Sequence, residues 1–409
     1  MVKSRYLTAQ EAAEELGVSL PTLYAYVSRG LIHSESAGGS GRNRRYHLED
    51  IEKLKARKEV RRNPTAAADS ALHWGAPVIE TAITLIEDGH LYYRGLDAID
   101  LAKSHSVEEV AALIWTGHIE DAEILFHGHI PEISPIWETI CPHLDGLTPL
   151  ERLQVALPLA AANDLAAYDL RPSAVAQTGA RILAVIVGVL TGQYPTRTDI
   201  ARTLQAAWAP NDPLAAHLLN AALVVCADHE LNVSSFTARC VASGGSTPYA
   251  VVIAGLAALQ GAKHGGLTER VEAFFREAGT PDSVRPAIAG RLKRGESLPG
   301  FGNRFYPEGD PRGRLLVDLV TRAHPHLPEV ELATAIVDTA DELMDEHPTV
   351  DFGLAALASA LKLPEGAALA LFALGHTIGW IGQAIEQYRI DTMIRPRARY
   401  IGDSPNGEN

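Results

Sequence analysis

Residues 298–312 combine turn-forming residues with side chains that can bind an anion, in the order Leu-Pro-Gly-Phe-Gly-Asn-Arg-Phe-Tyr-Pro-Glu-Gly-Asp-Pro-Arg. Their prolines and glycines interrupt any regular helix or strand, and Asp310-Pro311 is typical of a turn. Gly300 and Gly302 have no Cβ, so the backbone there can come close to a ligand. The donors that suit an anionic ligand are Asn303, Arg304 and Arg312. Two interpretations stay open for this stretch alone, an anion-binding loop and a surface loop closed by the Asp-Pro-Arg turn.

The composition indicates a large helical protein. The chain has 409 residues, of which 46% are hydrophobic and 6% aromatic, which supports a large core and two to three domains. Alanine and leucine are abundant, which favours helices over sheets. The three cysteines, Cys141, Cys226 and Cys240, form no disulfide framework and indicate a reducing cytoplasm. Cys and His do not cluster at zinc spacing, so we expect no metal site.

The charge is distributed unevenly. Residues 1–62 contain 12 Lys and Arg against 8 Asp and Glu, a net charge of +4, whereas the remainder contains 24 against 42, a net charge of −18. This distribution predicts a separate partner for the N-terminal segment and argues against nucleic-acid binding by the acidic body. The residues after Lys3 and Arg5 are polar and acidic, so we expect no signal peptide. Apolar runs such as residues 182–190 are too short to span a bilayer.

The N-terminal segment has the signals of two short helices. Thr8 and Glu11 form a capping box for a helix over residues 9–16, and Gly17 ends that helix. Ser19 then caps a second helix that runs to about Arg29. Two short helices joined by a tight glycine turn indicate a helix-turn-helix.

A Gly/Ser-rich hairpin at residues 36–45 and a basic helix at residues 48–60 follow, and this order resembles the MerR/excisionase type of winged helix-turn-helix. In that type the second helix enters the major groove of duplex DNA and the wing contacts the backbone. The resemblance implies groove contacts from Ser19, Thr22, Tyr24, Tyr26 and Arg29. It implies phosphate contacts from Arg42, Arg44 and Arg45. The alternative is a small helical adaptor with a solvated basic face.

From residue 71 the chain has the pattern of successive helices, with a short hairpin expected at residues 81–93 around Asp88-Gly89. Over about residues 76–402 it resembles the citrate synthase family, in an order and spacing that chance does not explain. The motifs that carry this resemblance are Tyr93-Arg-Gly-Leu-Asp97, residues 106–117, residues 228–237 with Asp-His-Glu, Gly261-Ala-Lys-His-Gly-Gly266, residues 298–312, His347-Pro-Thr-Val-Asp-Phe352, Gly379-Trp380 and residues 394–402.

The resemblance implies condensation of an acyl-CoA co-substrate with a 2-oxo acid such as oxaloacetate, with no permanently bound cofactor. Asp351 matches the base that removes the proton alpha to the thioester, and its neighbours Val350 and Phe352 would raise its pKa by desolvation. His264 matches the residue that stabilises the enol oxygen. The alternatives are a helix N-cap for Asp351 and a helix C-terminal histidine before a glycine stop for His264.

The resemblance also assigns residues to the two substrates. His229 and Arg312 match ligands of the oxo acid, and Arg395 matches an arginine that the family supplies across a dimer interface. We therefore expect a homodimer. The residues matched to the acyl-CoA are Pro299, Gly300, Phe301 and Gly302. The alternatives are a satisfied, half-buried histidine for His229 and a surface tail for Arg395.

Three positions depart from the family pattern. Asn303 replaces the histidine that protonates the ketone oxygen, and an amide has no proton to give near neutral pH. His376 replaces a carboxylate-binding arginine, for which a neutral histidine is a weak substitute. Pro307 replaces a basic residue near the CoA phosphates.

We predict a mostly α-helical, citrate synthase-like two-domain fold behind a winged helix-turn-helix. The predicted segments are the DNA-binding domain at 1–62, a linker at 63–70, a large helical domain at 71–267 and 353–405, and a small helical domain at 268–352. Two functions stay open, a condensing enzyme of the cytoplasm and a DNA-binding regulator whose body senses a carboxylate or acyl-CoA without turnover. The departures at Asn303 and His376 favour the regulator, whereas Asp351 and His264 favour the enzyme.

Overall fold

The computed structural model describes residues 6–28, 32–36, 44–47, 50–51, 79–127, 135–192, 199–398 and 400–402. Most of these residues are helical, as the composition predicts. The chain divides into two units, residues 81–395 and a second unit made of residues 1–80 and 396–409. The predicted linker at 63–70 lies outside the described residues, so the domain boundaries assigned from the sequence stay predictions.

The N-terminal unit contains a helix pair and a small sheet. Its elements are β1 (Tyr6–Leu7), α1 (Ala9–Leu16), α2 (Leu20–Ser28), β2 (Ser34–Ser36) and β3 (Arg44–His47). The strands are antiparallel in the order β1-β3-β2. The predicted capping box of Thr8 and Glu11 is confirmed, and Gly17 ends α1 at a φ of 59°. The buried core of this unit consists of Ala12, Ala13, Leu16, Leu23, Ile32, Tyr46 and Ile51.

A three-stranded sheet opens the larger unit. Its strands are β4 (Thr84–Glu87), β5 (His90–Tyr93) and β6 (Leu96–Asp97), antiparallel in that order. Asp88 and Gly89 have φ values of 50° and 78°, the conformation that a two-residue hairpin turn requires. The predicted hairpin is therefore confirmed, and only the short third strand was not predicted from the sequence.

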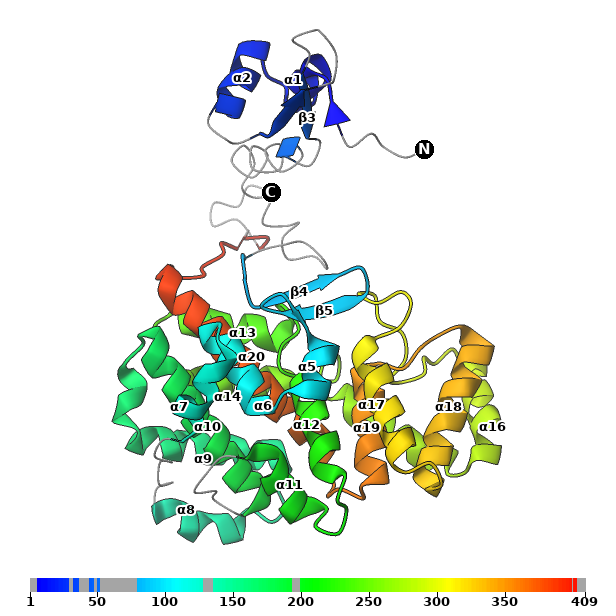
Figure 1. Ribbon diagram of the computed structural model, residues 1–409. Coiled ribbons are helices and arrows are strands. Elements are labelled where there is room, and N and C mark those ends of the chain that lie inside the picture. The colour runs from blue at the N-terminus through cyan, green and yellow to red at the C-terminus, as the bar shows by residue number, and fades with distance from the viewer. Residues whose placement is uncertain are drawn as a thin grey trace. The chain divides into compact units, whose positions relative to one another are not determined.

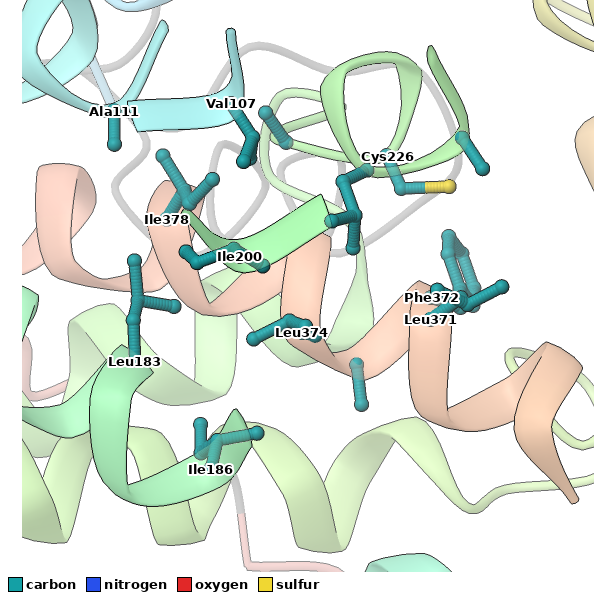
Figure 2. Close-up of a cluster of buried hydrophobic side chains, with 14 of the residues drawn as sticks. Val107, Ala111, Leu183, Ile186, Ile200, Cys226, Leu371, Phe372, Leu374 and Ile378 are labelled. Carbon is teal, nitrogen blue, oxygen red and sulfur yellow. The ribbon is translucent and has the colours of Figure 1, made fainter. Parts of the chain in front are cut away.

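Helices surround one central helix, α20 (Ala367–Ile390), in the larger unit (Figure 1). Its direct neighbours include α6 (Val107–Thr116), α10 (Pro172–Thr191), α12 (Ala215–Val225), α13 (Val233–Ser243) and α14 (Pro248–Leu259). The other elements of this group are α5 (Ala98–Ser104), α7 (Ala122–Phe126), α8 (Pro135–Ile140), α9 (Pro149–Asn163), α11 (Ile200–Trp208) and the 3₁₀ turns Ile119–Asp121, Cys141–His143 and Leu165–Tyr168. Figure 2 shows how α6, α10 and α20 share one apolar core, with Ala111, Leu183 and Ile378 among its side chains.

Two of these helices, α10 and α20, are long and apolar enough to cross a membrane. They are longer than the apolar run at residues 182–190 that the sequence suggested. Yet 72% and 100% of the residues in their most apolar windows are buried inside the structure. Burial in the core explains their composition.

A smaller helical group has its own apolar cluster. Its helices are α15 (Leu267–Ala278), α16 (Pro281–Lys293), α17 (Pro311–Ala323), α18 (Pro328–Met344) and α19 (Val350–Ala360). In Figure 1 the labelled helices α16 to α19 lie together, coloured from yellow-green to orange. Helix α19 serves both clusters, because Phe352 packs into the smaller one and Leu354 into the larger one. The predicted boundary at residue 352 thus falls inside a continuous helix, and Leu316 and Val320 of α17 belong to the larger cluster, so the proposed division stays a prediction.

Candidate active site

The loop at residues 298–310 is attached to the segment that precedes α19. Gly302 donates its N–H to the carbonyl oxygen of His347 over 3.2 Å, and the Thr349 N–H donates to the carbonyl oxygen of Gly300 over 2.8 Å. Gly300 and Gly302 have φ values of 83° and 74°, in the left-handed region that favours glycine. Both glycines are therefore needed for the backbone path that places this loop beside α19.

Arg312 and Asp310 form a buried pair where the loop enters α17. Asp310 is the N-cap of α17, and its carboxylate accepts from the Arg312 N–H. The same carboxylate accepts from Nε of Arg312 over 2.9 Å and from Nη2 over 2.7 Å. Burial acts to lower the pKa of Arg312, but the Asp310 carboxylate keeps it above the ordinary value. A permanently charged guanidinium thus lies in the interior of the site.

His229 meets this loop through Tyr306. Its Nε2 lies 3.0 Å from the Tyr306 hydroxyl, and the guanidinium of Arg312 lies 5.7 Å from the centre of the Tyr306 ring. Burial, together with the positive charge of Arg312, holds the pKa of His229 well below its usual range. The predicted oxo-acid ligands His229 and Arg312, 83 residues apart in the sequence, are therefore neighbours on either side of Tyr306.

Asn303 is held by the same loop. Its Nδ2 donates to Oδ2 of Asp310 over 3.2 Å, and its Oδ1 accepts from the Phe305 N–H over 3.0 Å. The amide group therefore lies beside the Arg312–Asp310 pair, where it supports the turn.

A chain of hydrogen bonds joins the two other candidate histidines. Nε2 of His264 lies 2.8 Å from the Ser234 hydroxyl, which also donates to Oδ1 of Asn232 over 2.8 Å. Nδ2 of Asn232 lies 2.9 Å from Nε2 of His376. The rings of His264 and His376 are 6.2 Å apart, and burial lowers their pKa values to about 4 and about 3. Both histidines are therefore neutral at physiological pH.

His264 lies in the turn between α14 and α15, not at the end of a helix, so the alternative that placed it at a helix C-terminus is wrong. Asp351 is the second residue of α19, whose N-cap is Thr349, so the N-cap alternative for Asp351 is also wrong.

Asp351 is a buried carboxylate with few partners. Its Oδ1 accepts from the Thr268 hydroxyl over 3.0 Å and its Oδ2 from the Thr349 hydroxyl over 3.4 Å. Burial raises the pKa of Asp351 to about 6, while the Thr268 hydrogen bond and the charge of Arg312 oppose that rise. The predicted direction of the shift is confirmed. A carboxylate with this pKa is suited to general-base work near neutral pH.

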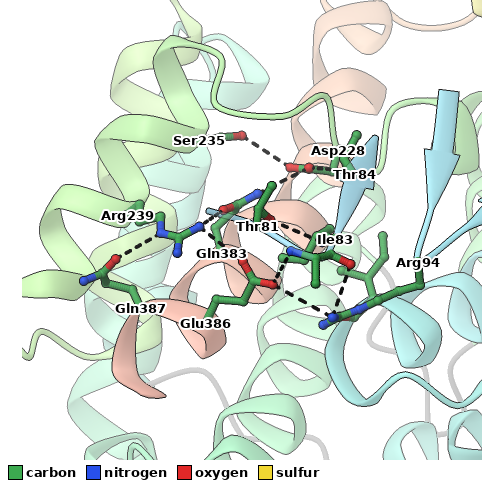
Figure 3. Close-up of polar contacts among 12 residues, drawn as sticks. Thr81, Ile83, Thr84, Arg94, Asp228, Ser235, Arg239, Gln383, Glu386 and Gln387 are labelled. Carbon is green, nitrogen blue, oxygen red and sulfur yellow. Dashed lines mark hydrogen bonds and ion pairs between the residues drawn. The ribbon is translucent and has the colours of Figure 1, made fainter. Parts of the chain in front are cut away.

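The turn that carries His229 is held by a buried polar network (Figure 3). The carboxylate of Asp228 accepts from the Thr84 hydroxyl over 2.6 Å and from the Gln383 amide over 3.4 Å. The fully buried Arg239 donates to Gln383 over 2.8 Å and to Glu386 over 3.2 Å. Because Asp228 immediately precedes His229, this network fixes the backbone from which the His229 ring projects.

The residues predicted to contact the acyl-CoA have different environments. Pro299, Gly300 and Phe301 are buried, and Phe301 packs in the smaller apolar cluster, whereas Gly302 is exposed. A cavity of about 400 Å³ lies on the exposed side of this loop. It is lined by Phe301, Gly302, Asn303, Arg304, Tyr306, Pro307, Gly309, Asp345, Glu346 and His347.

Arg395 lies apart from these contacts. It is exposed on the tail after α20, and none of the hydrogen bonds and ion pairs found in the described part of the chain includes it. The expected contribution of Arg395 to a second chain stays a prediction.

The DNA-contact candidates are only partly described. Ser19, Thr22, Tyr24 and Tyr26 lie on α2 or immediately before it, and Tyr24 is 52% exposed. Arg44 and Arg45 are exposed on β3. Arg29, Arg42 and all but residues 50–51 of the predicted helix at 48–60 lie outside the described residues.

One group of possible metal ligands occurs among the described residues. Side-chain atoms of Asp341, Asp345 and His347 lie within 4.8 Å of one another, and both aspartates are exposed. Exposed acidic groups at a helix end commonly bind only solvent, so we assign no metal to them.

Four functional neighbours were missed from the sequence. Tyr306 bridges His229 and Arg312, Ser234 and Asn232 orient the two histidines, and Thr268 contacts Asp351. Ser234 and Asn232 lie inside the 228–237 motif and Tyr306 inside the 298–312 stretch, so a search of those motifs for polar residues would have found these three. Thr268 gave no signal, because its contact depends on how α15 packs against α19.

Comparison with known proteins identifies two sequence families in the chain. The sequence matches the family described as "Citrate synthase, C-terminal domain" over residues 71–397 and the one described as "Helix-turn-helix domain" over residues 6–59. Citrate synthase 2 of Bacillus subtilis is 29% identical over 351 residues, which cover 80% of this chain and 94% of that protein. Citrate synthase of Synechocystis sp. is 30% identical over 357 residues, covering 80% and 90%.

Solved structures have the same fold. The citrate synthase of Pyrobaculum aerophilum is 26% identical, with a TM-score of 0.67 and coverage of 80% of this chain and 90% of that one. A ternary complex of citrate synthase from Thermoplasma acidophilum with carboxymethyl coenzyme A and oxaloacetate is 23% identical, with a TM-score of 0.69 and coverage of 81% and 95%.

Proposed function

Because the chain belongs to the citrate synthase family and carries a helix-turn-helix domain, we propose that it condenses an acyl-CoA with a 2-oxo acid and also binds duplex DNA. The observation that carries the enzymatic proposal is the buried carboxylate of Asp351, with its pKa raised to about 6 by burial. A relative of known structure binds a coenzyme A derivative together with oxaloacetate, which supports this pair of substrate classes.

In the proposed reaction Asp351 removes a proton from the carbon alpha to the thioester. In this proposal the neutral ring of His264 stabilises the enol oxygen by a hydrogen bond, and the contact of its Nε2 with the Ser234 hydroxyl positions that ring. The nucleophilic carbon then forms a bond to the ketone carbon, and the ketone oxygen takes up a proton. Water finally cleaves the thioester and releases the CoA thiol.

Arg312, Tyr306 and His229 bind the oxo acid in this proposal. The guanidinium attracts its carboxylate, and the Tyr306 hydroxyl and His229 ring supply neutral hydrogen bonds. The exposed cavity beside the 298–310 loop is the proposed position of the acyl-CoA, with Gly302 at its edge. Arg395 from a second copy would complete the site in a homodimer. Sedimentation that shows a folded, active monomer at micromolar concentration would remove this part of the proposal.

A second candidate function is a DNA-binding regulator whose body binds the same ligands without turnover. Asn303 favours it, because its amide supports the Asp310 turn and has no proton to give to a ketone oxygen. The helix-turn-helix domain serves either function.

Thiol release separates the two candidates. The full chain is incubated with acetyl-CoA or propionyl-CoA and a panel of 2-oxo acids, and calorimetry measures oxo-acid binding in parallel. The enzyme proposal predicts thiol release with at least one pair. Binding without thiol release from any pair would overturn it in favour of the regulator.

A further inference from the structure

His376 is a neutral group with no free ring nitrogen. The Oδ1 of Asn232 accepts from the Ser235 N–H over 2.9 Å, so its Nδ2 faces Nε2 of His376 and donates to it over 2.9 Å. The proton of the His376 ring therefore sits on Nδ1, which donates to the carbonyl oxygen of Cys226. With both nitrogens engaged and only 1% of its surface exposed, His376 offers no charge and no free donor to a ligand.

Aromatic rings surround His376. The Phe372 ring centre lies 4.4 Å from that of His376, the Trp380 ring centre 6.1 Å and the His264 ring centre 6.2 Å. This end of the site is therefore uncharged and largely aromatic.

The charge balance of the site is unfavourable for a dianion. Among the described residues Arg312 is the cation beside the ligand candidates, since the fully buried Arg239 pairs with Glu386, and two donors of Arg312, Nε and Nη2, already face Asp310. Asp351 adds a second carboxylate, whereas His229, His264 and His376 are neutral. A ligand with two carboxylates would bring in a second negative charge, and the described residues of this chain place no cation beside His376 to meet it.

We propose that the 2-oxo acid of this site is a monocarboxylate, whose single carboxylate lies at Arg312 and whose uncharged end faces the His376 side. The inference rests on the proposed ligand site, and it names the substrate class within it. The Arg312–Asp310 pair carries one positive and one negative charge, so it cannot by itself neutralise the carboxylate of the oxo acid. Arg395 from a second copy would neutralise that one carboxylate.

The test uses two 2-oxo acids of equal carbon number that differ at one end. In 2-oxobutyrate a methyl group stands where oxaloacetate has its second carboxylate. We expect 2-oxobutyrate to exceed oxaloacetate in association constant and in kcat/KM for thiol release by roughly 10²-fold, the discrimination of an apolar pocket against an isostere that adds a polar group. The pair 2-oxopentanoate and 2-oxoglutarate repeats the comparison with one more carbon.

His376→Arg supplies the missing cation, and we expect it to reverse the preference toward oxaloacetate. His376→Gln stays neutral and is expected to keep the preference for 2-oxobutyrate; thermal unfolding of both variants shows that they are folded. Equal or tighter binding of oxaloacetate to the parent would overturn the inference, as would binding of neither acid. Preferential binding of 2-oxobutyrate without thiol release would support the ligand class while overturning the condensing function.

Discussion

Gly300 lies so close to Val271 that a Cβ on the glycine would be 2.8 Å from Cγ2 of Val271 and 3.1 Å from Cβ of Phe352. The 298–310 loop therefore packs directly on α15 and α19 at this point. Gly302 is different, since a Cβ there would lie 3.4 Å from its nearest neighbour, the flexible end of the Glu346 side chain. The two glycines share a left-handed backbone but only one of them is sterically enclosed.

This contrast predicts unequal effects of two matched substitutions. Gly302→Ala should cost about 1 kcal/mol of unfolding free energy, because an L-residue is strained at positive φ. Gly300→Ala adds overpacking against Val271 and should cost roughly 2–4 kcal/mol in total. Urea unfolding monitored by circular dichroism measures both. Equal losses for the two variants would contradict the close packing of Gly300.

Asp351→Asn should remove most of the condensation activity while it leaves oxo-acid affinity nearly unchanged. The amide keeps the oxygen that accepts from Thr268 but cannot take a proton from the acyl-CoA. Binding depends instead on Arg312, Tyr306 and His229. We expect kcat to fall by about 10²–10⁴-fold, the range usual for loss of a general base. Thiol release and calorimetry measure the two properties, and turnover at the parental rate would show that Asp351 is not the base.

The predictable part of the fold is local in the sequence. The Thr8–Glu11 capping box, the Asp88-Gly89 hairpin and the turn at Asp310 depend on residues a few positions apart, and short-range chemistry identifies them. Motif resemblance located the residues whose roles we propose.

The state of His376 was not predictable in the same way. Its neutral tautomer depends on Asn232 and the Cys226 carbonyl, which lie 144 and 150 residues away in the sequence. The contact of Tyr306 with His229 likewise joins residues 77 positions apart. Such contacts follow from how whole helices pack, and no local pattern specifies them.

The acidic limb of the pH profile of kcat/KM should report the ionisation of Asp351. Because the base acts in its ionised form and burial raises its pKa to about 6, kcat/KM should fall as the pH decreases through about 6. Thr268→Val removes a hydrogen bond that favours the ionised carboxylate, so the limb should move to higher pH. Thr268→Ser retains the hydroxyl and serves as the control. A limb that stays in place in the valine variant would exclude Asp351 as the titrating group.

The N-terminal unit should bind duplex DNA at an inverted repeat if the protein is a two-fold dimer. Arg44→Ala combined with Arg45→Ala removes two exposed cations from β3, so binding to all sequences should weaken and the salt slope should decrease by about 2 per chain. Tyr24→Ala is the matched comparison, since this exposed residue of α2 is a groove candidate and should affect sequence preference more than salt dependence. Mobility-shift experiments with fragments from the gene's own upstream region, at several salt concentrations, measure the salt dependence and the sequence preference. The absence of any shift at low salt would contradict DNA binding.

Asn303→His should increase condensation. The imidazole would stand beside the Asp310 carboxylate, which Asn303 now contacts over 3.2 Å, and a neighbouring carboxylate favours the protonated ring. A protonated histidine can both polarise the ketone and give a proton to its oxygen, whereas the amide can only donate a hydrogen bond. We expect a gain of about 10–10²-fold in kcat, part of the ~10²–10⁴-fold that a general acid contributes. Asn303→Gln, which lengthens the side chain without adding an acid, should show no gain. Thiol release with the preferred 2-oxo acid measures all three proteins, and a parent that already turns over at the median enzymatic rate of about 10 s⁻¹ would show that Asn303 is no handicap.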